Sequence, residues 1–182
     1  MDDRLFQTML AAGIKYLAIR ARSIADTTQH LNRKLKKLNI DDQEREETVT
    51  QVIDRLKEYG YLDDQRFAEQ FAHGQVSRRL VGKRRLTQEL TQQKVESATV
   101  REAVEEVYAE IPESDVLEEL LQKFIRSNGL PASPQEINRL TNMLVRRGFS
   151  FDLILPRLRQ LARQARLETM SEALDAIQMN EE

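Results

Sequence analysis

The chain has 182 residues, of which 5% are aromatic, with no tryptophan and no cysteine. The absence of cysteine excludes disulfides and thiol catalysis, argues against a structural zinc site, and suits a reducing compartment. The formal net charge is −2. No apolar run approaches the roughly 20 residues that span a bilayer, and the first residues are acidic where a secretory signal would be basic. We therefore expect a cytoplasmic protein without a membrane segment.

One short pattern of leucines and polar residues occurs three times along the chain. It begins at Leu31, Leu86 and Leu140, so the starts lie 55 and 54 positions apart. In each copy a second leucine follows four residues later, at Leu35, Leu90 and Leu144. Self-similarity at a fixed period is typical of repeat arrays, in which each unit buries its apolar face against a neighbour.

Apolar residues at helical spacing lie before and after each copy of the pattern. Those that follow are Val49, Ile53 and Leu56, then Val100, Val104 and Val107, then Ile154, Leu158 and Leu161. Three such stripes per unit predict three helices per repeat and nine in all. The predicted fold is therefore all-α, with three tandem three-helix repeats in an elongated, curved array. The repeats span 1–60, 61–111 and 112–161, and a tail at 162–182 forms an additional C-terminal helix.

Helix boundaries are indicated by capping residues. Ser23 with Asp26, Asp41 with Glu44, and Ser133 with Pro134 and Glu136 predict helix starts, because each supplies a side-chain oxygen and a first-turn acid. Helix ends are predicted at Asn39, Gly60, Gly129 and Gly148, whose residue types tolerate a left-handed backbone.

Two residues fit these predicted helix boundaries poorly. Lys94 stands where the other copies have Asn39 and Gly148, so the middle cap should be weaker or differently built. Pro156 falls inside the last predicted helix, where it removes a hydrogen bond. That helix should therefore kink or begin close to Pro156.

The charges are unevenly distributed despite the small net charge. Basic residues gather at 20–37, 78–94 and 139–166, mainly on the predicted second helices, whereas residues 102–119 are acidic. Stacked repeats would align these faces as a basic stripe beside an acidic strip, which suits a polyanion or an acidic protein. The alternative, that they are only the solvated faces of surface helices, stays open.

The basic cluster around Gly82 is the best candidate for contact with a partner, because the forked guanidinium groups of arginine bind carboxylates and phosphates well. A turn at Gly82 would leave the flanking cations reachable. Arg146 and Arg147 either contact a partner or stabilise the negative end of a helix. The full set of candidate partner-binding residues is Arg78, Arg79, Lys83, Arg84, Arg85, Arg146, Arg147, Lys34 and Lys37.

Three segments carry a resemblance to a known family. Residues 60–69 read GYLDDQRFAE, residues 79–86 read RLVGKRRL, and residues 146–152 read RRGFSFD. In this order and spacing they resemble the signatures of RecX proteins, bacterial regulators of the RecA recombinase, and the resemblance covers roughly residues 10 to 161. The acidic insertion in the first copy and Lys94, where glycine is usual, depart from the family pattern.

The resemblance implies a non-enzymatic module that binds the RecA filament on single-stranded DNA, and we expect this module to be a monomer. It further implies inhibition of recombinase, ATPase and coprotease activity, with a role in DNA recombination, DNA repair and the SOS response. Two other classes stay open: a nonspecific DNA-binding protein acting through its basic helices, and a helical scaffold for an acidic protein. Few aromatic residues alternate with the basic ones, so a base-stacking platform is not expected.

The first of the three segments also has a structural interpretation as the joint between two repeats. Gly60 should end a helix, Tyr61 and Leu62 should plug the junction, and Asp63 or Asp64 should cap the next helix. Phe67 and Phe71 should belong to the core. The motif comprises Gly60, Tyr61, Leu62, Asp63, Asp64, Arg66 and Phe67.

Enzyme classes are disfavoured by their missing residues. Gly82-Lys83 superficially resembles a phosphate-binding loop, but Ser77 replaces its first glycine and Arg84 the magnesium-binding hydroxyl. The two histidines, His30 and His73, are far apart and fit no zinc motif. We expect no catalytic residue, cofactor or metal.

Overall fold

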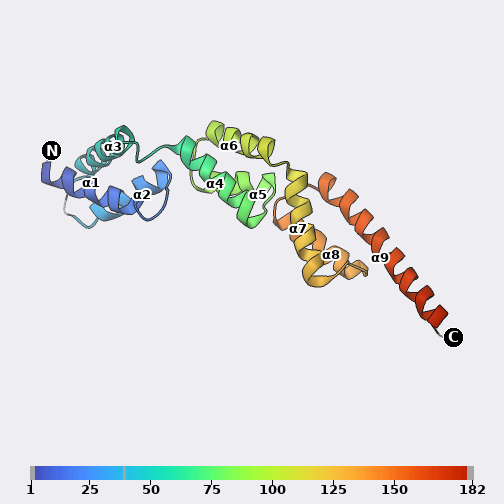
Figure 1. Ribbon diagram of the computed structural model, residues 1–182. Helices are drawn as coiled ribbons and strands as arrows, with labels where there is room; N and C mark the ends of the chain where they lie inside the picture. Colours follow the sequence, from blue (N-terminus) through green and yellow to red (C-terminus); the bar gives the residue numbers. More distant parts are fainter. Residues whose placement is uncertain (1–2, 39, 180–182) are drawn as a thin grey trace. The chain divides into compact units, whose positions relative to one another are not determined.

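The computed structural model describes residues 3–38 and 40–179 (Figure 1), and it describes side chains as far as residue 166. The described part of the chain contains nine helices and no strand. Their bounds are α1 Asp3–Leu17, α2 Ile24–Leu35, α3 Asp42–Glu58, α4 Asp64–Arg79, α5 Lys83–Gln92, α6 Ser97–Glu110, α7 Glu113–Asn128, α8 Pro134–Arg146 and α9 Phe151–Met179. The predicted all-α class with three helices per repeat is confirmed. None of the helices searched in this part has both the length and the apolar character needed to cross a membrane.

The chain divides into two compact units. Unit 1 comprises Met1–His73 with Thr87–Glu106, and unit 2 comprises Gly74–Leu86 with Val107–Glu182. The middle predicted repeat thus contributes segments to both units. The repeat borders at 60, 111 and 161 stay a prediction.

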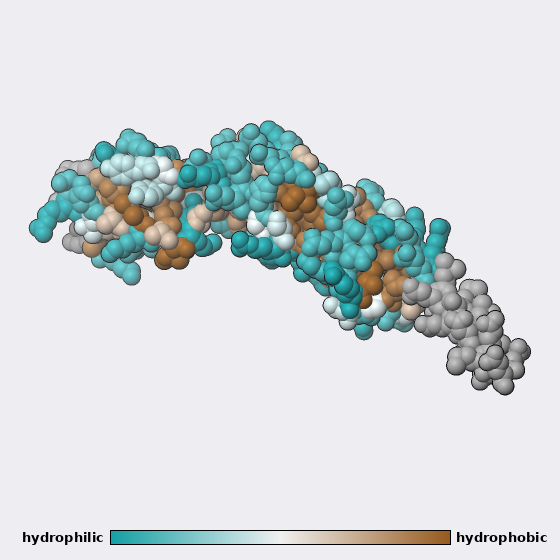
Figure 2. All heavy atoms as spheres, viewed as in Figure 1, coloured by the Kyte–Doolittle hydropathy of each residue, from teal (hydrophilic) through white to brown (hydrophobic). Residues whose placement is uncertain are grey.

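The repeated leucine pattern forms the core of the fold. Leu31 and Leu35, Leu86 and Leu90, and Leu140 and Leu144 are all 0% exposed. The nine apolar residues predicted to follow them on the third helices are also buried. In unit 1, α1 packs against both α2 and α3 around this core, and in unit 2, α8 packs against α9. The outward helix surfaces are mostly hydrophilic, as Figure 2 shows for one face.

All three predicted helix starts are confirmed. Ser23 caps α2 by accepting a hydrogen bond from the backbone N–H of Asp26, and Asp41 caps α3 in the same way. Ser133 and Glu136 form a reciprocal capping box at α8, with Pro134 in the first turn. Each cap satisfies amide groups that the first helical turn leaves unpaired.

The predicted helix ends are confirmed where the structure describes them. Gly60, Gly129 and Gly148 have φ angles of 70°, 77° and 94°. Asn39 lies outside the described residues. Lys94 has a φ of 57°, so the middle repeat uses the same left-handed turn, and the expectation of a different construction is wrong. A side chain in this conformation costs about 1 to 2 kcal/mol, consistent with a weaker cap.

The last helix excludes one of its two expected starts and continues through the predicted tail. It begins at Phe151 and contains Pro156, so of the two expected alternatives a start close to Pro156 is excluded. The tail predicted at 162–182 is helical as far as Met179, but as the continuation of α9 and not as an additional helix. The apolar stripe predicted on this tail, namely Leu167, Met170, Leu174 and Ile177, lies outside the residues whose side chains are described.

The segment that joins α3 to α4 is largely as predicted. Gly60 ends the preceding helix, Leu62 is 3% exposed, and the Asp63 carboxylate caps α4 by accepting from the backbone N–H of Arg66 at 3.0 Å. The Arg66 guanidinium donates to the Gly60 carbonyl at 2.6 Å and fixes the turn. Tyr61 does not plug the junction, because it is 50% exposed.

The two phenylalanines that follow on α4 differ in burial. Phe67 is a core residue, as predicted, whereas Phe71 is only half-buried. Their ring centroids lie 5.8 Å apart.

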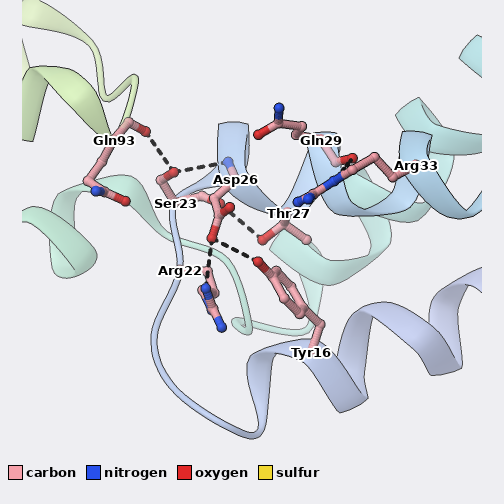
Figure 3. A network of polar contacts seen from close by, with 8 residues as sticks. All are labelled: Tyr16, Arg22, Ser23, Asp26, Thr27, Gln29, Arg33 and Gln93. Carbon is pink, nitrogen blue, oxygen red and sulfur yellow. Dashed lines mark hydrogen bonds and ion pairs between the residues drawn. The ribbon is translucent and has the colours of Figure 1, made fainter.

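Two polar contacts in unit 1 tie the start of α2 to segments of the next repeat. The Ser23 hydroxyl donates to the Gln93 carbonyl at 2.8 Å (Figure 3). The backbone N–H of Ile24 donates to the Asp64 carboxylate at 2.8 Å. Burial of the Asp64 carboxyl raises its pKa above the ordinary value.

Unit 2 repeats this arrangement at the start of α5. The backbone N–H of Gly82 donates to the Arg147 carbonyl at 2.8 Å, and that of Lys83 donates to Glu113 at 2.8 Å. In both units the first residue of a second helix donates to a carboxylate on the first residue of the next first helix. The repeat therefore extends to the polar contacts between repeats.

Candidate functional site

Five arginines in unit 2 surround one hollow of about 430 Å³, which we call the arginine hollow. Two of its sides are the end of α4 with the following turn and the end of α8. It is lined by Arg78, Arg79, Val81, Arg85, Met143, Arg146 and Arg147. Basic residues from the second and third predicted repeats thus meet at one place. Such a concentration of guanidinium groups favours an anionic ligand surface.

The hollow is built on a close backbone contact between two turns. At Gly148, a Cβ atom would lie 2.3 Å from the backbone N of Arg85, and at Gly82 one would lie 2.6 Å from the backbone of Gly148. Hydrogen bonds join the turns from Gly82 N–H to the Arg147 carbonyl and from Arg84 N–H to the Gly148 carbonyl. Gly82 is buried, so its role is this close approach, which only a residue without a side chain allows.

Further contacts hold the α4–α5 turn in a strained conformation. Leu80 has a φ of 50°, which is rare for a residue with a branched side chain. The Tyr108 hydroxyl of α6 donates to the Val81 carbonyl at 2.5 Å, and the Arg147 guanidinium donates to the Arg79 carbonyl. Burial raises the pKa of Tyr108 above its ordinary value, so the phenol stays a donor. The turn is thereby fixed from two sides.

Tyr108→Phe should lower the free energy of unfolding by about 1 to 3 kcal/mol, because it leaves the buried Val81 carbonyl without its donor. Urea denaturation followed by circular dichroism measures this difference. Tyr61→Phe is the matched control, since the Tyr61 side chain is half-exposed, and it should change stability by less than about 0.5 kcal/mol. Equal effects of the two substitutions would show that the Tyr108 contact does not stabilise the turn.

The structure places the predicted contact residues in three groups. Arg78, Arg79, Arg85, Arg146 and Arg147 line the arginine hollow. Lys83 and Arg84 are exposed in the first turn of α5 and do not line it, although the Lys83 ammonium lies 5.5 Å from the centroid of the Tyr108 ring. Lys34 and Lys37 are exposed residues of unit 1.

The expectation that basic residues sit mainly on second helices needs correction. Arg78 and Arg79 belong to the last turn of α4, a first helix. In unit 1, Arg22 precedes α2 and pairs with Asp26 at 3.1 Å. In unit 2, Arg157 of α9 pairs with Glu118 of α7, and hydrogen bonds from Gln122 and Arg157 lower the pKa of Glu118.

Sequence reasoning missed the residues that support the hollow. Tyr108 and Glu113 contact the α4–α5 turn from 27 and 30 residues away, and no local pattern marks such contacts. Glu113 could have been found as the equivalent of Asp64, because each is the first residue of a repeat's first helix. The described part of the chain holds no group of three metal-ligating side chains.

Comparison with known proteins places the chain in a family. Residues 63–104 match the model of the second three-helix domain of RecX, and residues 112–155 match that of the third. The regulatory protein RecX of Chromobacterium violaceum is 31% identical over 145 residues, which cover 80% of this chain and 90% of that protein. The RecX protein of Mycobacterium sp. (strain JLS) is 32% identical, covering 78% and 75%.

Relatives differ in length, and solved structures share the fold. The RecX protein of Oceanobacillus iheyensis is 27% identical over 81% of this chain, which spans only 51% of that relative. The crystal structure of RecX from Lactobacillus salivarius has a TM-score of 0.68 at 17% identity, covering 87% of this chain and 97% of that one. At that identity the likeness concerns the fold alone, whereas the sequence matches above show the family. The chain belongs to the RecX family of regulatory proteins.

Proposed function

We propose that the protein binds the RecA–DNA filament and inhibits its recombinase, ATPase and coprotease activities, with the arginine hollow as a contact surface. It acts in the cytoplasm as a monomer, by binding and without catalysis of its own. Membership of a family of regulatory proteins supports the regulatory role. The basic hollow supports a partner that carries phosphates or carboxylates.

The observation that carries this proposal is the meeting of five arginines from two predicted repeats at one hollow. Helix α5 begins with Lys83, Arg84 and Arg85 and has no acid in its first turn. Cations near the positive end of a helix dipole are unfavourable by a few tenths of a kcal/mol up to about 1 kcal/mol each. A bound polyanion would add to the compensation that the Glu113 carboxylate provides at the backbone N–H of Lys83.

Binding to bare and to RecA-coated single-stranded DNA at physiological salt tests the proposal, together with the ATP hydrolysis rate of the filament. We expect much tighter binding to the coated DNA and a fall in ATP hydrolysis as the protein is added. Fluorescence anisotropy of labelled DNA measures the first, and a coupled ATPase assay the second.

Two other outcomes would replace the proposal. Bare DNA bound as tightly as coated DNA would favour a direct DNA-binding protein. On duplex DNA, a plot of the logarithm of its affinity against the logarithm of the salt concentration should have a slope of about −0.9 for each phosphate contacted. Binding to neither form would leave the helical scaffold.

A further inference from the structure

A second cationic site lies in unit 1, around an aromatic stack. The rings of Tyr16 and His30 are nearly parallel, with centroids 3.8 Å apart and planes 7° apart. The guanidinium carbon of Arg22 lies 4.2 Å from the centroid of the Tyr16 ring. At these distances the imidazole of His30 and the guanidinium of Arg22 cannot lie on the same face of the Tyr16 ring, so Tyr16 lies between Arg22 and His30.

Polar contacts hold this stack in place. The Tyr16 hydroxyl donates to Asp26 at 3.0 Å, and Arg22 donates to the same carboxylate oxygen at 3.1 Å (Figure 3). Asp26 is fixed in turn by its backbone N–H, which donates to the Ser23 hydroxyl at 3.1 Å. The outer member of the stack, His30, is therefore carried on a pre-organised base.

The stack forms part of the wall of a hollow of about 580 Å³ between α1 and α2, which we call the stacking hollow. Its wall combines the two rings, small alanines, two exposed lysines and the 77% exposed side chain of Ile19. The lining residues that matter are Ala11, Lys15, Tyr16, Ile19, His30 and Lys34. Burial and the charges of Lys34 and Arg33 lower the pKa of His30, so the imidazole is neutral at pH 7.

We propose that the stacking hollow binds an unpaired base of a single-stranded nucleic acid, which stacks on His30 while Lys15 and Lys34 contact the adjoining phosphates. A flat neutral ring between cations suits a planar base on a charged backbone, since every base has a π-face. An acidic helical peptide would instead need an extended apolar groove, and the wall here includes a rigid aromatic stack. This site is separate from the arginine hollow.

Two oligonucleotides with equal numbers of phosphates test the proposal, a short oligothymidylate and its abasic counterpart. The intact protein should bind the oligothymidylate about 5- to 150-fold more tightly, the range that loss of one base–aromatic stack produces. His30→Ala should bring the two affinities together, and His30→Phe should keep them apart. His30→Leu serves as a second non-aromatic variant, because it preserves apolar packing on Tyr16.

Controls separate stacking from charge and from misfolding. Gln29→Ala changes an exposed neighbour on α2 and should keep the preference for bases. The His30 variants should keep the salt dependence of the wild type, since they remove no phosphate contact, and circular dichroism shows whether they fold.

Several results would overturn the base-binding site. One is equal affinity of the wild type for both oligonucleotides. Another is a preference for oligothymidylate that persists in folded His30→Ala and His30→Leu variants. A third is that the wild type shows no preference between the oligonucleotides and that an acidic peptide displaces them from this hollow. No recombinase is present in this assay, so its failure leaves the filament proposal untouched.

Discussion

Gly148→Ala should lower the free energy of unfolding by about 2 to 6 kcal/mol, through backbone strain and a steric clash together. The φ angle of 94° disfavours any residue with a Cβ atom, and that atom would lie 2.3 Å from the backbone N of Arg85. Backbone cannot rotate away as a flexible side chain can, so the two turns must separate. Urea denaturation followed by circular dichroism measures the loss.

Two glycines of the same unit separate the causes. Gly129 has a φ of 77° but open space around its Cβ position, so Gly129→Ala should show the strain of about 1 to 3 kcal/mol alone. Gly74 lies within α4, where its Cβ position has no neighbour, so Gly74→Ala should stabilise by about 0.5 to 1 kcal/mol. If Gly148→Ala cost no more than Gly129→Ala, the clash would contribute nothing.

The core could be predicted from the sequence because its information is local and repeated. A leucine four residues after Leu31, Leu86 and Leu140 falls on the same helix face in every copy, and all six residues are fully buried. The caps were predictable for the same reason, since Ser23 and Asp41 act on amides three residues away. Lys94 shows where a local rule fails: the repeat imposes its left-handed turn on a residue that disfavours it.

The two hollows could not be predicted, because they depend on contacts between distant segments. Charge clustering indicated Arg78 and Arg146 separately, but only the approach of Gly82 to Gly148 brings their helices to one hollow. The stack of Tyr16 on His30 joins two helices across a turn, and a scarcity of aromatic residues gave no sign of it. A single well-placed ring is enough for stacking on a base, and the amino-acid composition does not show where one ring is placed.

Arg78→Glu combined with Arg146→Glu should weaken filament inhibition by at least about 100-fold, if the arginine hollow contacts the filament. Charge-assisted hydrogen bonds contribute about 1.5 to 3 kcal/mol each, and the double substitution removes two such donors and adds repulsion. Both residues are exposed, one from each side of the hollow. By contrast, Arg147 donates to the Arg79 carbonyl and would report on folding as well. The protein concentration that halves the filament's ATP hydrolysis measures the effect.

Lys123→Glu combined with Arg126→Glu is the matched control. It makes the same change in net charge on exposed residues of α7 in unit 2, and neither residue lines the hollow. A general electrostatic attraction between protein and filament would respond equally to both double variants, whereas a specific contact responds only to the first. The preference for oligothymidylate over its abasic counterpart should survive in both, because the stacking hollow belongs to unit 1. Inhibition that persists in a folded Arg78→Glu, Arg146→Glu variant would remove the arginine hollow from the contact surface and leave the regulatory role to be sought elsewhere on the chain.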